Sequence, residues 1–166
     1  MIARAGGQGR AERRGCSAKG SGRIEQGMKS RYATVHRQTT EGTDILDITD
    51  DVTKEVERSG IRNGIVVVGV AGSTASVTTI EFEPGVVEDL RQAIERAAPE
   101  GIHYAHDARW GDGNGHAHVR AALLGPSASF GVVEGAPVLG TWQQIVLCDF
   151  DNRPRRREVY VHVVGD

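Results

Sequence analysis

Cysteine is scarce in this 166-residue chain, and the two that occur, Cys16 and Cys148, form no Cys-x-x-Cys pair. This pattern argues against a disulfide framework, and without an apolar signal segment we expect a reducing, cytoplasmic location. Cys148 stands within the apolar run IVLCDF. We therefore predict that it is a small core residue.

Long apolar runs and a strong net charge are also missing. The run GIVVVGVAG at 64–72 has the length of a buried strand and falls short of the ~20 residues that span a bilayer. The formal net charge is only -2, so neither nucleic acid nor a membrane is an expected partner. The basic segment RPRRRE at 153–158 has no neighbouring aromatic residues. We expect a solvated turn there.

The first 28 residues have almost no apolar side chains, because Gly, Arg, Ser and Ala dominate them. Such a composition cannot bury enough surface to fold, so we predict a disordered tail over 1–28. The remaining length suits one core, and we expect a single domain over 29–166.

Strand-like segments dominate that domain. Three stretches have helical spacing and capping residues instead: 49–60, the segment between Pro84 and Pro99, and 117–125. About three helices interspersed irregularly among strands predict an α+β domain with a mostly antiparallel sheet layer. Strands are predicted at 32–39, 43–48, 64–70, 127–133, 141–150 and 157–165, with a Thr- and Val-rich segment at 72–85.

Four of the six histidines lie within HYAHDARWGDGNGHAHVRAALLG at 103–125. His116 and His118 would point the same way on an extended segment but diverge by about 200° in a helix. Glycines in the loop between them and His106 would let that loop fold back. We predict that His106, His116 and His118 bind one divalent metal ion, with Asp107 able to close the site. The alternative is that these histidines bond only to each other and to the loop backbone.

Two further segments contain side chains that could act on a substrate. Ser73 and Thr74, in AGSTAS, could hold an anion with backbone N–H groups, or could simply form a tight turn. Glu81 and Glu83 alternate with apolar residues, which predicts two carboxylates on the same side of a strand. One could act as a general base, although solvated carboxylates have the same pattern.

The segments GNGHAHVRAALLGPS and LGTWQQIVLCDFDNRPRRREV resemble the YjbQ family, whose members are often labelled secondary thiamine-phosphate synthase. The resemblance extends over about 32–165. It implies a YjbQ-like β-sandwich of mixed or antiparallel sheets with about three flanking helices, a homotrimer, and a polar site near subunit boundaries. Gly72 stands where the family carries a histidine.

The resemblance also implies roles for individual residues. Arg120 stands in place of a lysine and would suit bidentate phosphate binding. It joins Glu81 and Glu83 as a predicted catalytic residue. The predicted substrate- or anion-binding set is Ser73, Thr74, Arg120, Trp142 and Gln143, although Trp142 could instead belong to the core.

The predicted function is metal-assisted catalysis on a small phosphorylated metabolite. The specific form is a weak thiamine-phosphate synthase, in which a pyrimidine alkyl group moves from pyrophosphate to a thiazole phosphate. Histidine ligands favour Zn²⁺, whereas a thiamine-phosphate synthase would use Mg²⁺. The alternative is a non-catalytic trimeric protein that binds a metal ion or a small anion.

Overall fold

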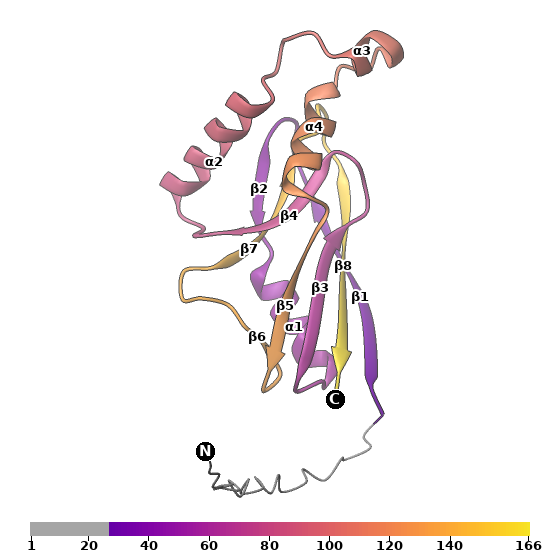
Figure 1. Cartoon of the computed structure of the whole chain (residues 1–166), viewed down its shortest axis with the longest axis vertical. Coiled ribbons are helices and arrows are strands. Elements are labelled where there is room, and N and C mark those ends of the chain that lie inside the picture. The colour runs from indigo at the N-terminus through magenta and orange to yellow at the C-terminus, as the bar shows by residue number, and fades with distance from the viewer. Residues whose placement is uncertain (1–26) are drawn as a thin grey trace, which may run out of the picture.

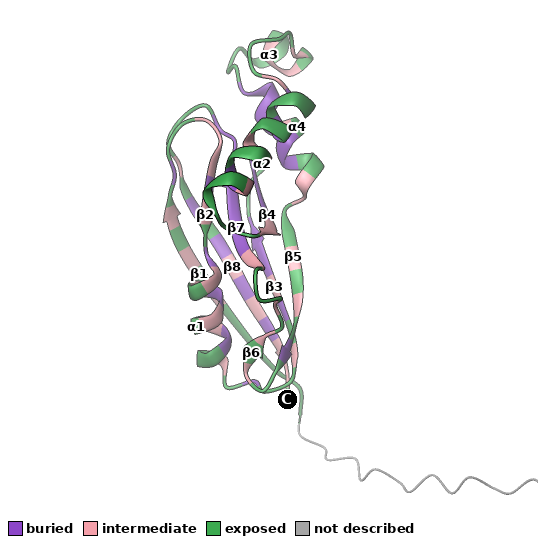
Figure 2. Cartoon of the chain, turned by 90° about the vertical axis from the view of Figure 1, so that its left-hand side faces the viewer, coloured by how far each residue is buried: buried purple, intermediate pink, exposed green. Residues whose placement is uncertain are grey.

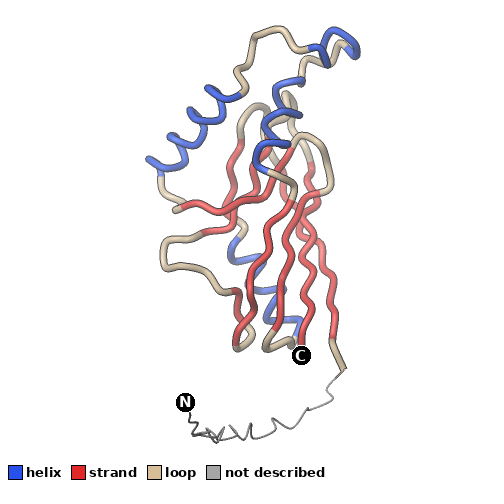
Figure 3. Tube along the Cα trace, in the orientation of Figure 1, coloured by secondary structure: helices blue, strands red, loops and turns tan. Residues whose placement is uncertain are grey.

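Two antiparallel sheets form the framework of the computed structural model, which describes residues 27–166. The predicted tail at 1–28 therefore lies, up to residue 26, outside the described residues. The elements are β1 (Lys29–Gln38), β2 (Asp44–Asp47), α1 (Thr49–Ser59), β3 (Gly64–Val70), β4 (Ala75–Ile80), α2 (Pro84–Ala97), α3 (Ala105–Trp110), α4 (Gly115–Leu124), β5 (Ser127–Val133), β6 (Ala136–Pro137), β7 (Gln144–Asp149) and β8 (Arg156–Gly165) (Figures 1 and 3).

Strand order separates a large sheet from a small one. The large sheet has the order β1-β8-β3-β5-β6, and the small sheet has the order β2-β7-β4. Each of the six strand pairings is antiparallel. With helices against these sheets, the predicted α+β class and the sandwich of antiparallel sheets are confirmed.

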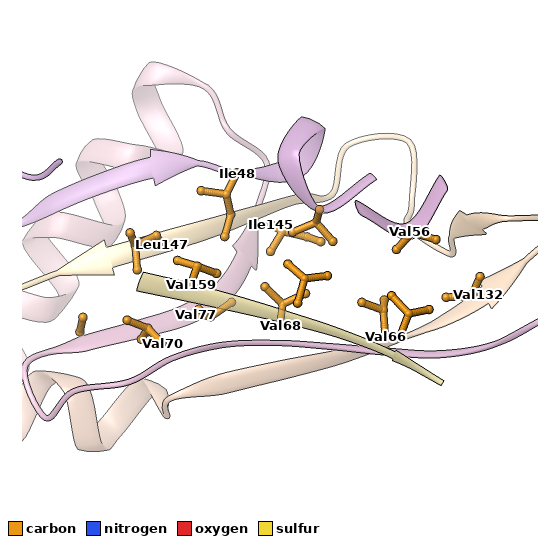
Figure 4. Close-up of a cluster of buried hydrophobic side chains, with 14 of the residues drawn as sticks. Ile48, Val56, Val66, Val68, Val70, Val77, Val132, Ile145, Leu147 and Val159 are labelled. Carbon is orange, nitrogen blue, oxygen red and sulfur yellow. The ribbon is translucent and has the colours of Figure 1, made fainter. Parts of the chain in front are cut away.

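The core has two parts, one on each face of the small sheet. Alternation along β7 sends Ile145 and Leu147 into a cluster with the valines of β3 and β8 (Figure 4). Val146 and Cys148 belong instead to a cluster with α2 and α4. Cys148 is the predicted core residue, and burial raises the pKa of its thiol to about 12. The small sheet is thus a middle layer, which explains why the β7 sequence is almost continuously apolar.

Residues 27–166 form four helices, where three were predicted. In α1, Val52 and Val56 are one turn apart and enter the core, and in α2 Val87 and Ile94 do the same two turns apart. The additional helix, α3, has six residues and buries none of them, so apolar spacing could not predict it (Figure 2). Among residues 27–166, no helix is long and apolar enough to cross a membrane.

The β3–β4 and β7–β8 connections meet at one end of the sheets, near α3 and α4 and away from the C-terminus (Figure 1). The β4–β7 ladder ends with the pair Ala75 and Asp149, and the β3–β8 ladder ends with Val70 and Val159. The β3–β4 loop (71–74) and the β7–β8 turn (150–155) therefore leave the sheets side by side. Their polar residues lie in the same region as the histidine-rich segment.

Candidate functional site

His106 on α3 and His118 on α4 lie close together. The ring centroids are 4.4 Å apart, and the ring planes are inclined by 48°. The sequence predicted that these two imidazoles would converge across the glycine-rich loop. The structure brings them close enough for both rings to contact a single ligand.

The local sequence explains why α3 folds back on α4. Gly111 ends α3 in the left-handed region (φ 69°), and its N–H donates to the Asp107 carbonyl at 2.8 Å. Gly115 packs directly against Tyr104, where a Cβ would lie only 2.5 Å from the Tyr104 Cβ. The Gly115 N–H also donates to Asp107 Oδ1 at 2.8 Å. These contacts hold His106 beside the first turns of α4.

Two aspartates adjoin His106, one member of the histidine pair. His106 Nε2 lies 3.3 Å from the Asp112 carboxylate, and donor atoms of His106, Asp107 and Asp112 all lie within 4.8 Å of one another. Ligands of one zinc ion each lie ~2.0–2.2 Å from it, so small side-chain movements would complete a nitrogen and oxygen shell. Sequence reasoning missed Asp112. Its signal was an aspartate in GDGNG between the histidines.

A cavity of about 250 Å³ borders His118, and Gly72 and Ser73 of the β3–β4 loop line its wall. The rest of its lining consists of small residues of α4 and the segments around it. The predicted anion-binding Ser73 and the predicted ligand His118 therefore face one space. A cavity of this size suits a small polar group rather than a large ligand.

Comparison with known proteins identifies the family. The sequence model described as UPF0047 protein YjbQ-like matches residues 33–166. The chain belongs to the YjbQ family. The resemblance noted in the sequence is therefore confirmed.

Relatives of this YjbQ-family chain cover most of its length. A UPF0047 protein of Archaeoglobus fulgidus is 40% identical over 124 residues, 75% of this chain and 94% of the relative. A UPF0047 protein of Methanocaldococcus jannaschii is 34% identical over 130 residues, 78% of this chain and 91% of the relative.

The fold is similar to that of solved YjbQ-family structures. A Sulfolobus solfataricus protein of unknown function superposes with a TM-score of 0.81 at 36% identity, covering 84% of this chain and all of that one. An uncharacterized Clostridium acetobutylicum protein gives 0.73 at 33% identity, with coverages of 79% and 98%. These likenesses support the YjbQ-like sandwich and leave the function open.

His116 does not join the histidine pair of this YjbQ-family site. Because α4 begins at Gly115, His116 and His118 are helical neighbours two positions apart and point in divergent directions. His116 is buried, and its Nε2 lies 3.6 Å from Glu100 Oε1 and has no hydrogen-bond partner among residues 27–166. The predicted set of three histidine ligands is thus reduced to two.

Arg120 has a different role from the predicted one. Its side chain is 1% exposed and donates to the Ala98 carbonyl at 2.9 Å, to Thr43 and to two carboxylates, Glu95 and Glu100. These contacts anchor α4 to the end of α2, and they already neutralise the guanidinium. Arg120 is therefore a buried structural residue of this chain rather than a residue that faces an anion or a reacting group.

Glu81 and Glu83 also differ from their prediction as paired carboxylates on a strand. β4 ends at Ile80, so both residues follow the strand. The Glu83 carboxylate caps α2 by accepting from the N–H groups of Gly85 and Val86 at 2.8 and 2.5 Å. The Glu83 N–H donates to the Glu81 carbonyl at 2.9 Å, so a tight turn, and not an extended strand, joins the two residues. Glu81 is exposed.

Trp142 and Gln143 lie at the other end of the small sheet from the histidine pair. Gln144, which begins β7, pairs with Ile80, whereas Asp149, which ends β7, pairs with Ala75 beside the β3–β4 loop. Six β residues span about 17–20 Å. Trp142 is 70% exposed, so it is not a core residue, and Gln143 Nε2 donates to Thr79 at 3.2 Å. Within one chain, the predicted anion ligands therefore fall into two groups at opposite ends of the small sheet, with Ser73 at one end and Trp142 and Gln143 at the other.

Thr74 belongs to a buried ionic network and not to the cavity wall. Its hydroxyl donates to Asp151 at 2.9 Å and accepts from Arg157 Nη2 at 2.8 Å. Arg157 also binds Asp149 through Nε at 2.6 Å and Nη2 at 2.5 Å. Asp149 and Asp151 are fully buried. The basic segment predicted to be a solvated turn thus supplies an arginine to the interior.

Proposed function

We propose that this protein is a metal-assisted enzyme acting on a small phosphorylated metabolite, with a divalent ion held between α3 and α4. The observation that supports this is the His106–His118 pair, with ring centroids 4.4 Å apart beside Asp112. Paired imidazoles with an adjacent carboxylate are a common ligand set for transition metals. The cavity that His118 shares with Ser73 provides adjoining space for a substrate.

The donor set fits zinc better than magnesium. Zn²⁺ accepts mixed nitrogen and oxygen ligands, whereas Mg²⁺ requires oxygen ligands in near-ideal octahedral geometry. Asp107 Oδ1 is held by the Gly115 N–H, which orients its carboxylate close to His106 and Asp112. Asp112 is the more exposed carboxylate and can move towards an ion. We therefore assign His106, His118 and Asp112 as ligands, with Asp107 as a ligand or an orienting neighbour.

The chain's own residues define the substrate side of the site. A bound divalent ion would lower the pKa of water and offset charge that develops on a phosphate. Ser73 is exposed at the cavity and can donate its hydroxyl to a phosphate oxygen. His118 forms part of the same wall, so an ion on its ring would adjoin the substrate. The transfer of a pyrimidine alkyl group from pyrophosphate to a thiazole phosphate is one specific reaction that this arrangement could serve.

Zinc binding is the first test. Protein purified without a polyhistidine tag and stripped with a chelator should bind about one Zn²⁺ per chain in calorimetry and elemental analysis. His106→Ala and His118→Ala should each weaken binding by more than about 100-fold, since even residues that only orient ligands change affinity by 10–100-fold. His103→Ala is the matched control, because His103 is an exposed residue of the same segment. Equal zinc affinity in all four proteins would contradict the proposal.

Turnover is the second test. Zinc- and magnesium-loaded protein would be incubated with a panel of phosphate monoesters, and separately with the pyrimidine pyrophosphate and thiazole phosphate pair. Release of phosphate or pyrophosphate should disappear in His118→Ala and persist in His103→Ala. Tight zinc binding with no turnover on either panel would favour the alternative, a non-catalytic protein that binds a metal ion or an anion.

We also propose a homotrimer. The predicted anion-binding residues Ser73 and Trp142 lie at opposite ends of β4 and β7 in one chain. A site that uses both groups needs contact between copies, which a symmetric oligomer supplies.

A further inference from the structure

Arg157 has a donor group that the buried network does not use. A guanidinium carries five N–H donors. Nε donates to Asp149, and Nη2 donates to Asp149 and Thr74, which uses one edge of the group. Nη1 has no hydrogen-bond partner among residues 27–166. Two N–H donors therefore remain on a side chain that is only 9% exposed.

The strand register explains where this donor group lies. Val159 of β8 pairs with Val70, the last residue of β3, so Arg157 lies beyond the end of that ladder. Alternation along β8 places Arg157 on the same buried side as Val159. The β3–β4 loop passes over the guanidinium at this point. A Cβ built on Gly72 would lie 3.3 Å from Arg157 Nη1.

Nη1 also reaches solvent. The fully buried polar side-chain atoms without a partner in the described part of the chain are Asn114 Oδ1, His116 Nε2 and Asp151 Oδ1. Arg157 Nη1 also has no partner among residues 27–166, but it is not fully buried. Gly72, with φ 151° and no side chain, leaves the space beside Nη1 open.

The same glycine forms part of the cavity next to His118. Gly72 and Ser73 line this cavity, and their backbone N–H groups make no hydrogen bond within residues 27–166. The loop thus offers two backbone N–H donors and a hydroxyl at residues 72–73, and Gly72 is the residue that lies beside Arg157 Nη1. Donors that converge from a backbone loop and a guanidinium are typical of phosphate recognition.

We propose that Arg157 Nη1, together with the Gly72 and Ser73 N–H groups, forms an oxyanion subsite that binds the phosphate group of the substrate. Arg157 supplies the guanidinium N–H donors that the sequence had assigned to Arg120. The bidentate contact with Asp149 fixes the guanidinium plane, so Nη1 is held in position before the ligand arrives. The assignment to a substrate rests on the proposed function, whereas phosphate binding itself does not require the metal.

Inorganic phosphate is the probe for this subsite, added to chelator-treated full-length protein and followed by ³¹P line broadening and calorimetry. Arg157→Lys keeps the charge but removes the second nitrogen of the fork, and it should weaken phosphate binding by about 10-fold or more. Arg155→Lys is the matched control. Arg155 contacts Asp151 of the same network, whereas the side chain next to a Cβ at Gly72 is that of Arg157. Arg155→Lys should leave phosphate affinity within about 2-fold of wild type.

A second variant covers the case in which Arg157→Lys does not fold. Gly72→Val fills the space above Nη1 and strains the loop backbone at φ 151°, so it also displaces the Gly72 and Ser73 N–H groups; it should weaken phosphate binding by about 10-fold or more, while thermal melting shows a folded protein. Zinc affinity should stay unchanged in this variant, and phosphate binding to metal-free protein should persist in His118→Ala. Unchanged phosphate affinity in folded Gly72→Val, or no phosphate binding by wild type, would overturn the subsite. A wild-type protein that binds phosphate but does not bind zinc would refute the metal proposal and leave the phosphate subsite standing.

Discussion

At the scale of single residues, the buried carboxylates Asp149 and Asp151 at the end of β7 pair with Arg155 and Arg157. Asp151 is fully buried, and burial by itself raises the pKa of its carboxyl group. The hydrogen bonds from Thr74 and Arg155, and the charges of Arg155 and Arg157, outweigh that effect and hold the pKa below its ordinary value of 3.8. Asp151 therefore favours the folded state only while it is ionised.

Asp151→Asn should destabilise the protein at neutral pH by about 3–5 kcal/mol, because it removes one member of a buried ionic network. The pH dependence follows from the lowered pKa. The contribution of Asp151 is fully present above its ordinary pKa of 3.8 and is lost as pH falls through the lower folded value. Wild-type stability should thus decline below about pH 4, and the variant should decline less.

Urea unfolding between pH 7 and pH 2.5 measures this prediction. Asp89→Asn, on the exposed side of α2, is the control and should follow the wild-type curve. A variant as stable as wild type at pH 7, or one with the same acid dependence, would show that Asp151 does not act in this way.

At the scale of elements, the histidine pair depends on how closely α3 approaches α4. Gly115 is the closest point, because any Cβ there would lie 2.5 Å from Tyr104 Cβ and 2.8 Å from Tyr104 Cγ. Both atoms are near the backbone and cannot swing aside. A single methyl group added at Gly115 would therefore push α3 away from α4.

Gly115→Ala should lower stability by about 1–3 kcal/mol through overpacking. The sign of this stability change is informative. Ala favours helix over Gly by about 1 kcal/mol, so a purely local effect would stabilise α4. The displaced α3 should also move His106 away from His118, so zinc affinity should fall together with the melting temperature.

Gly140→Ala is the matched control, because a Cβ there meets only ordinary contacts at 3.7 Å with Gln143. Thermal melts and zinc titrations of both variants measure the expected loss of stability and of zinc affinity. A Gly115→Ala protein with greater stability and unchanged zinc affinity would show that the approach of α3 is not what positions the pair.

The elements themselves were largely predictable because their signals are local. Apolar alternation and Pro84 as a helix start predicted most strands and α2 close to their observed bounds. α3 and the two-residue β6 were missed, since neither buries enough apolar residues to leave a pattern in the sequence. The convergence of His106 and His118 was predicted because glycines in the intervening loop allow it.

The roles of the charged residues were less predictable because they depend on partners far away in the chain. Arg120 meets Glu95 and Glu100 only once α4 packs against the end of α2. The Arg157 side chain points into the interior because the β8 register places it next to Asp149. No spacing rule places these partners together.

At the scale of the whole molecule, a single chain leaves Trp142 uncovered. Its side chain is 70% exposed on the loop between β6 and β7. The other tryptophan, Trp110, is also exposed, but the Arg109 guanidinium lies 5.3 Å from its ring centroid and covers one face. Trp142 also belongs to the predicted anion-binding set that one chain divides between two ends of its small sheet. We therefore expect another copy of the chain to cover it.

Light scattering should give a mass about three times the 17.8 kDa of one chain at micromolar concentration. Trp110→Phe leaves Trp142 as the only tryptophan of the sequence, and its fluorescence should be shifted to shorter wavelength in the trimer and should move to longer wavelength on dilution. Trp142→Phe, which leaves only Trp110, is the control and should emit like an exposed indole at every concentration. A monomeric mass, or a trimer in which Trp142 emits as a fully exposed side chain, would refute the idea that contact between copies covers Trp142 and unites the two groups of predicted ligands.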